Sequence, residues 1–181
     1  MKHLILLFAF VPSVIFANNK ALGQNPCTLI KSPLDCSIIE KNVSKLLRGD
    51  DNCVLALIDT VCGEIVRTGD RRYLVALDTI ATNSDGYVSE HLLDIGVTLF
   101  YKKLPMLAHY LAGRDKNNPG AIERLIVESM SMYLSTTNSP DKRRDKIKAH
   151  VYQLKAEKKI NDQEYAYLEN LIKRFDPTMF K

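Results

Sequence analysis

The sequence contains no tryptophan, and it has only 8 glycines and 7 prolines in 181 residues. The residues that most often interrupt helices are therefore confined to a few positions. Sustained alternation of apolar and polar residues is missing, as are Asn-Gly turns between apolar runs, so we expect no strands. After residue 16 no apolar run is long enough to cross a membrane, which excludes a spanning helix there.

Motifs of common enzyme and metal sites are also missing. The chain has no Gly-x-Ser-x-Gly, no phosphate-binding glycine loop, no His-Glu-x-x-His and no Cys-x-x-Cys. His91, His109 and His150 have no second histidine or cysteine at ligand spacing. His91 with Asp94 fits a surface hydrogen bond better than a metal site, and Met106 beside His109 fits packing better than copper binding. We therefore expect no metal, no cofactor and no enzymatic activity.

The N-terminal residues have the pattern of an export signal. A short basic start precedes an apolar run at residues 4–16, which is too short to span a membrane, and Ala17 offers a small residue for cleavage. The even number of cysteines agrees with an oxidising compartment. We expect residues 1–17 to be a signal peptide and the mature protein to be periplasmic or secreted from a bacterium.

The cysteines are spaced C-x8-C-x16-C-x8-C, at Cys27, Cys36, Cys53 and Cys62. Cys53 and Cys62 lie on one predicted helix, about 13 Å apart at 1.5 Å per residue, which is too far for a disulfide. Each must therefore pair with Cys27 or Cys36. A turn near Gly49 favours Cys36–Cys62 with Cys27–Cys53, and the nested pairing, Cys27–Cys62 with Cys36–Cys53, stays open. Either set would clamp an N-terminal pair of helices.

Apolar residues recur with a 3.6-residue period in about eight segments, which predicts an all-α fold of about eight helices. By length, residues 33–176 form one domain, after a lead-in at 18–32 and before a tail at 177–181. Residues that start or stop helices separate the segments: Ser32-Pro33, Gly49, Asp50 or Asp51, Gly69, Asp70, Ser84 or Asp85, Pro105, Gly113, Pro119, Ser139-Pro140 and the capping box of Asn161 with Glu164.

The predicted helices group into four helical hairpins, which start near Pro33, Arg71, Pro105 and Pro140, at intervals of 38, 34 and 35 residues. A period of this length resembles the architecture of HEAT and tetratricopeptide repeat proteins, in which hairpins stack side by side. That resemblance implies a stack with a binding surface along its rim. An orthogonal bundle of helices with similar lengths is the alternative.

Charge is distributed unevenly. Residues 18–139 hold 13 basic and 14 acidic residues, whereas residues 140–181 hold 11 basic and 7 acidic ones. A solvated helix face, a docking surface for an acidic protein, and a surface for anionic membranes or polyanions are the three interpretations of this excess. The export signal disfavours nucleic acid. The excess is concentrated in Lys142, Arg143, Arg144, Lys146, Lys148, Lys155, Lys158 and Lys159.

These features favour a non-enzymatic, exported helical protein that binds a partner protein, of acidic character if the basic segment is the docking surface. Its small, helical, disulfide-bonded format is similar to that of periplasmic immunity proteins, and the resemblance implies an inhibitor of a toxin delivered between cells. Partner-binding candidates are an aromatic residue at a predicted loop and five basic residues: Tyr87, Lys142, Arg143, Arg144, Lys146 and Lys148.

Two other functions stay open at this point. One is a carrier of an apolar small molecule, which would lie in a cavity between helices. The other is a cell-wall hydrolase, which needs two carboxylates across a cleft. Glu64 and Glu90 are the candidate carboxylates for that reaction.

Overall fold

The computed structural model describes residues 34–84, 86–114 and 120–180, and these residues form seven helices and no strand. The all-α prediction is therefore confirmed. The predicted signal peptide and lead-in, residues 1–32, lie outside the described residues. No described helix is long and apolar enough to cross a membrane. The helices are α1 (Cys36–Leu46), α2 (Asp51–Thr68), α3 (Arg71–Asn83), α4 (Gly86–Ala112), α5 (Gly120–Ser135), α6 (Pro140–Ala156) and α7 (Asp162–Lys173).

Several helix ends are fixed by the local chemistry that the sequence indicates. The side chains of Asp50 and Asp70 cap α2 and α3 by accepting hydrogen bonds from free backbone N–H groups of the first turn. Gly69 ends α2 with a φ of 69°, which favours glycine. Asn161 and Glu164 form the predicted capping box at the start of α7.

The first helix is shorter than predicted. It begins at Cys36 rather than at Pro33, because Asp35 is its N-cap and accepts a 3.0 Å hydrogen bond from the Ser37 backbone N–H. It ends at Leu46, with Leu47 as its C-cap, so Gly49 lies in the following turn and does not end the helix. The predicted cap, Ser32, lies outside the described residues.

The predicted fourth and fifth helices are the two halves of α4, and a kink separates them. Pro105 lacks a backbone N–H and its ring crowds the preceding turn, and the backbone departs from helical geometry at Lys103, with φ −136° and ψ 27°. The second half of α4 follows this break and ends at Ala112. Leu99 and Leu104, on the two sides of the kink, are both fully buried, so packing holds the two halves together.

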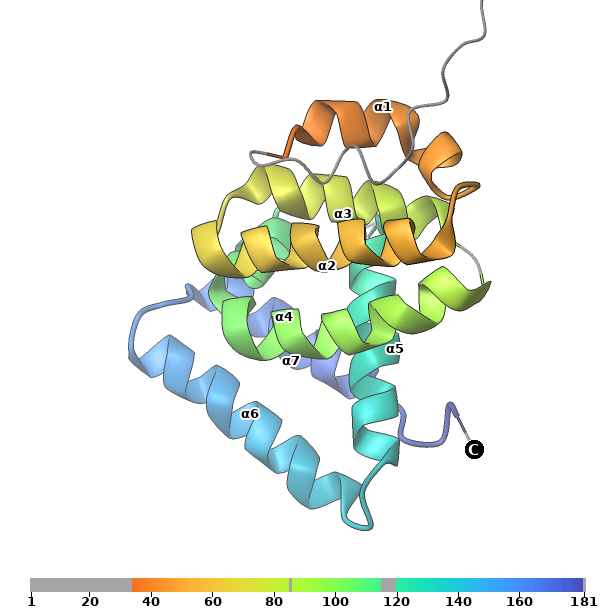
Figure 1. The fold of residues 1–181 in the computed structure, drawn as a ribbon. Coiled ribbons are helices and arrows are strands. Elements are labelled where there is room, and N and C mark those ends of the chain that lie inside the picture. The colour runs from red at the N-terminus through yellow and green to blue at the C-terminus, as the bar shows by residue number, and fades with distance from the viewer. Residues whose placement is uncertain (1–33, 85, 115–119, 181) are drawn as a thin grey trace, which may run out of the picture.

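The predicted hairpin of the first two helices is not formed. Helix α1 packs mainly against α3, and Figure 1 shows it lying along α3 at one end of the molecule. Helix α2 packs against α3 and α4 instead. Helices that are neighbours in sequence were expected to pair. The apolar face of α1 (Ile39, Val43 and Leu46) is instead buried in the core that α3 shares.

The favoured Cys36–Cys62 disulfide is contradicted, because both side chains are free thiols. Cys36 lies where α1 meets α3, close to Arg72, while Cys62 lies on α2 in a pocket shared with α4. Cys53 is not a free thiol. Its predicted partner, Cys27, lies outside the described residues, so the Cys27–Cys53 bridge stays a prediction.

A thiol titration tests this arrangement. Unreduced, denatured protein is expected to show two free thiols per chain, from Cys36 and Cys62, and four after reduction. No free thiol before reduction would contradict the separation of Cys36 from Cys62. Four free thiols before reduction would contradict the Cys27–Cys53 bridge.

Helix α4 lies at the centre and packs against α2, α3, α5 and α7 (Figure 1). It approaches α5 closely at Gly96, where a Cβ atom would lie 2.1 Å from the Ser129 Oγ atom. Phe100 packs edge-on against Phe175, with ring centroids 5.9 Å apart, and this contact joins α4 to the C-terminal segment. Glycine at position 96 is therefore required by packing rather than by backbone conformation.

A buried carboxylate joins three helices. Asp78 of α3 accepts hydrogen bonds from the Tyr110 hydroxyl (3.0 Å), from the Arg114 guanidinium at the end of α4, and from the Ile122 backbone N–H (2.8 Å). The last bond satisfies a donor left free in the first turn of α5. Burial raises the pKa of Tyr110 to about 12, and the neighbouring carboxylate adds to that effect. The phenol therefore stays protonated and donates to Asp78.

Candidate functional site

Helix α6 lies at an edge of the molecule, remote from α1 (Figure 1). It carries six basic and two acidic residues, and only Ile147, Val151 and Leu154 are buried. This narrow apolar stripe packs against α5 and α7. The remaining surface of α6 faces solvent over most of its circumference, as the predicted stripe implied.

The two arginines of this helix are used by the fold. The Arg143 guanidinium lies 4.3 Å from the centre of the Tyr133 ring and donates to the Tyr133 carbonyl and to the Thr136 hydroxyl (2.9 Å), so it holds the end of α5. Arg144 donates a 2.8 Å hydrogen bond to the Phe175 carbonyl beyond α7. These two partner-binding candidates are therefore mainly structural residues.

The lysines divide into two groups. Lys155 pairs with Asp162 at 3.0 Å, and Lys159 pairs with Glu157 at 2.7 Å. Lys142, Lys146 and Lys148 are exposed and form no ion pair or hydrogen bond with any described residue. The structure therefore leaves three of the predicted basic candidates available to a partner.

The three free lysines share one side of α6 with an exposed aromatic residue. Successive residues are rotated by about 100° about the helix axis. Lys142 and Lys146 therefore lie on one half of the exposed surface of α6, and Lys148 and Tyr152 lie on the other half. Tyr152 is 65 % exposed. We call Lys142, Lys146, Lys148 and Tyr152 the outer face of α6. Two exposed acidic side chains, Asp141 and Asp145, also lie on this side of the helix.

Tyr87 is not part of this surface. It is 58 % exposed in the first turn of α4. Helix α4 meets α6 at Tyr101, whose ring centroid lies 6.0 Å from that of His150. Fourteen residues separate Tyr87 from Tyr101, or about 21 Å along a helix. The structure therefore separates Tyr87 from the basic candidates, and its predicted role in binding stays untested.

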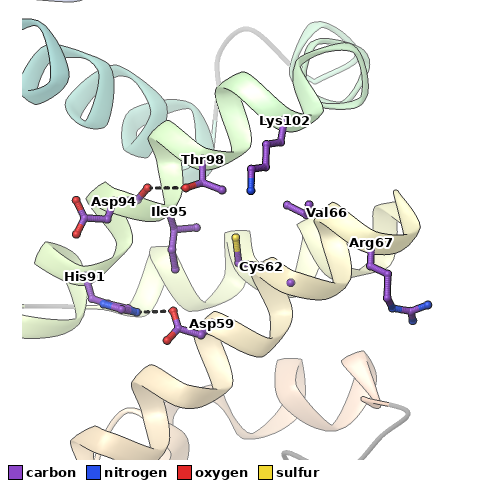
Figure 2. A pocket seen from close by; sticks show the side chains of 10 residues that line it. Asp59, Cys62, Val66, Arg67, His91, Asp94, Ile95, Thr98 and Lys102 are labelled. Carbon is purple, nitrogen blue, oxygen red and sulfur yellow. Dashed lines mark hydrogen bonds and ion pairs between the residues drawn. The ribbon is translucent and has the colours of Figure 1, made fainter.

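A groove of about 440 Å³ lies between α2 and α4 (Figure 2). Its lining is mostly apolar, with Cys62, Val66 and Ile95 along its length. Gly63 also lines it, and a Cβ atom there would meet no atom within 4 Å. The groove is therefore open beside Gly63.

One end of the groove is acidic. The Asp59 carboxylate accepts a 2.8 Å hydrogen bond from the His91 ring across the two helices, and Asp94 lies beside them (Figure 2). The predicted His91 and Asp94 pair is therefore replaced by a pairing of His91 with Asp59. Burial, with the Asp59 charge, raises the pKa of the Cys62 thiol above its usual value, although Lys102 acts in the opposite direction. Cys62 is consequently a neutral thiol at pH 7.

The other end of the groove is basic. Lys102 reaches over the groove toward Cys62, whereas Arg67 points away from it (Figure 2). Arg67 pairs with Glu64 at 2.5 Å, while Lys102 has no ion-pair partner within the described chain. Lys102 is therefore the available cation of this groove.

The remaining candidates have other contacts. His109 bonds Glu164 at 2.9 Å, and Met106 packs against the core. The described residues contain no cluster of three or more side chains that could hold a metal. The Arg67 hydrogen bond lowers the pKa of Glu64, which is opposite to what a general acid needs. Neither Glu64 nor Glu90 lines the groove.

The groove itself was not predicted. Asp59 and His91 are 32 residues apart in sequence, so no spacing rule joins them. The contacts of Asp78 could have been predicted from the sequence. Its carboxylate lies within the apolar stripe of a helix, and a buried carboxylate needs a buried partner. Glu123, bonded to Tyr167 and Arg174, has the same signal beside Ile122 and Ile126.

Comparisons with protein-family models, with curated proteins and with solved structures give no match.

Proposed function

We propose that this protein is an exported, non-enzymatic helical protein that binds an acidic partner protein through the outer face of α6. The observation that supports this proposal is the division of the basic residues. Arg143 and Arg144 anchor α6 to α5 and to the C-terminal segment, and Lys142, Lys146 and Lys148 remain exposed on the anchored helix.

An anchored basic face has a physical advantage in binding. The helix does not have to be ordered when the partner arrives, which lowers the entropic cost of association. Lysines at its surface attract an acidic protein over roughly one Debye length and raise the association rate. Tyr152 supplies an exposed aromatic side chain, of the type enriched among residues that dominate binding energy.

The proposed class of partner follows from the expected export of the protein and from its small helical architecture. The N-terminal pattern indicates export, and the small helical format is similar to that of immunity proteins, so the proposed partner is a toxin delivered between cells. Inhibition of a captured partner's enzymatic activity would support this class. A captured enzyme whose activity is unchanged when this protein is bound would contradict the proposal that the partner is an inhibited toxin.

The test is affinity capture with a matched charge control. Bait protein with Lys142→Glu, Lys146→Glu and Lys148→Glu is expected to lose at least about 90 % of a partner that the wild type enriches, because three attractive charges become repulsive. The control bait carries Lys41→Glu and Lys45→Glu on α1 and Arg48→Glu in the turn after it, with the same change of charge at exposed residues. Quantitative mass spectrometry compares the three baits.

The control variant distinguishes an effect of the binding surface from an effect of the net charge of the protein. Equal loss with both variants would mean that net charge, rather than the outer face of α6, controls binding. Full retention by the α6 variant would refute the proposed surface. Circular dichroism and thermal unfolding of both variants check that the fold is kept.

A further inference from the structure

We propose that the groove between α2 and α4 is a second binding site, which takes an amphipathic monocarboxylate: an apolar tail that ends in a single carboxylate. The carboxylate lies at Lys102, and the tail lies along Val66, Ile95 and Cys62. This inference does not depend on the proposed function of α6.

The size and lining of the groove fit such a ligand. Its volume of about 440 Å³ lies within the range of about 300–1,000 Å³ that is typical of small-molecule sites. Most of the exposed surface of the groove is apolar, with Asp59, His91 and Asp94 at one end and Lys102 at the other. An apolar tail would cover Val66 and Ile95, which border the groove on opposite helices (Figure 2).

The charges determine the direction of the ligand. Lys102 is the free cation at one end and reaches over the apolar floor (Figure 2). At the other end the Asp59 carboxylate and Asp94 repel an anion. Charge complementarity therefore places the carboxylate of the ligand at Lys102. A carboxylate near His91 is excluded, because the His91 ring already pairs with Asp59.

Cys62 gives a readout inside the groove. It is a free thiol, 8 % exposed, and its sulfur points into the space that the tail would occupy (Figure 2). The two free thiols of the described residues are Cys36 and Cys62, so the Cys36→Ser variant leaves Cys62 as the one to react. A bound tail covers the sulfur, so it slows reaction with a maleimide.

The experiment measures the protection of Cys62 by octanoate, decanoate and octanol, with isothermal titration calorimetry as a second readout. Octanoate is expected to protect Cys62 up to about fivefold better than octanol, because only the ionised acid forms an ion pair with the exposed Lys102 ammonium. Decanoate is expected to bind more tightly than octanoate, by up to about fourfold for each added methylene that is buried. Equal protection by the acid and the alcohol would overturn the assignment of a carboxylate.

Three variants test the location. Lys102→Ala is expected to abolish the preference for the acid over the alcohol. Lys103→Ala removes the same charge one residue away, where the ammonium lies 3.9 Å from the Cβ position of Gly69, and is expected to change nothing. Gly63→Leu places a side chain in the open groove and is expected to weaken decanoate binding at least about tenfold.

Other results would contradict the site. Absence of both protection and binding heat at millimolar decanoate would overturn the proposal. Unchanged decanoate binding in folded Gly63→Leu protein would also overturn it, since the ligand would then lie elsewhere.

Discussion

Replacement of Gly96 by alanine is expected to lower the free energy of unfolding by about 2–3 kcal/mol. The new Cβ atom would lie 2.1 Å from Ser129 Oγ, 2.7 Å from Ser129 Cβ and 3.4 Å from the Leu125 carbonyl oxygen. Rotation of the serine side chain cannot move its Cβ atom, so α4 and α5 must separate. Overpacking of this kind typically costs about 1–3 kcal/mol, occasionally more, and the better helix propensity of alanine offsets part of it.

Gly63 supplies the matched control for this prediction. It lies in the interior of α2, and a Cβ atom there meets nothing within 4 Å. Gly63→Ala is therefore expected to stabilise the protein by up to about 1 kcal/mol, since alanine favours the helix over the unfolded chain. Urea unfolding followed by circular dichroism measures both variants.

A second-site variant identifies the cause. Gly96→Ala combined with Ser129→Gly removes the two nearest atoms and is expected to recover about 1 kcal/mol of the loss. A Gly96→Ala protein as stable as Gly63→Ala would show that α4 and α5 do not approach each other closely at this position.

Asp78→Ala is expected to destabilise the protein by about 3 kcal/mol or more. The substitution leaves the Arg114 guanidinium, the Tyr110 hydroxyl and the Ile122 backbone N–H without their shared acceptor. Loss of one partner of a buried ion pair typically costs about 3–5 kcal/mol, and the lower value applies because Arg114 is 24 % exposed. The melting temperature is expected to fall by about 6–12 °C for a chain of this length.

Asp59→Ala is the control for Asp78→Ala. Its carboxylate also bonds a side chain from another helix, but it is 62 % exposed. Exposed ion pairs contribute about 0–1 kcal/mol, so the melting temperature is expected to change by at most a few degrees. Similar losses in the two variants would contradict the claim that Asp78 is the buried connection among α3, α4 and α5.

The features of the fold that the sequence predicted correctly are local ones. Asp50, Asp70 and Asn161 each act through hydrogen bonds within one helical turn, so the pattern around them is sufficient. Pro105 was predicted to begin a new helix, and the non-helical backbone at Lys103, two residues before it, does divide α4 into two helical halves. How closely the two halves pack, with Leu99 and Leu104 both buried, depends on the other helices, which the local pattern does not contain.

Pairing of helices and of side chains was less predictable. The partner of α1 depends on which apolar face it covers, and the Cys36–Cys62 prediction was wrong for that reason. The basic segment was located correctly, yet its arginines and lysines look alike in sequence. Only the positions of Tyr133 and Phe175 show that Arg143 and Arg144 are used by the fold.

The central claim is that the outer face of α6 attracts an acidic protein. The measurement that tests it most directly is the association rate of the captured partner at about 50 mM and 200 mM salt, for the wild type, the Lys142/Lys146/Lys148 reversal and the Lys41/Lys45/Arg48 reversal. We predict a rate that falls at least tenfold with salt for the wild type and for the Lys41/Lys45/Arg48 reversal. For the α6 variant we predict a slow rate that does not fall with salt, because salt screens the repulsion that the reversed charges create. A wild-type rate that does not change with salt, or an α6 variant that associates as fast as the wild type, would contradict the claim.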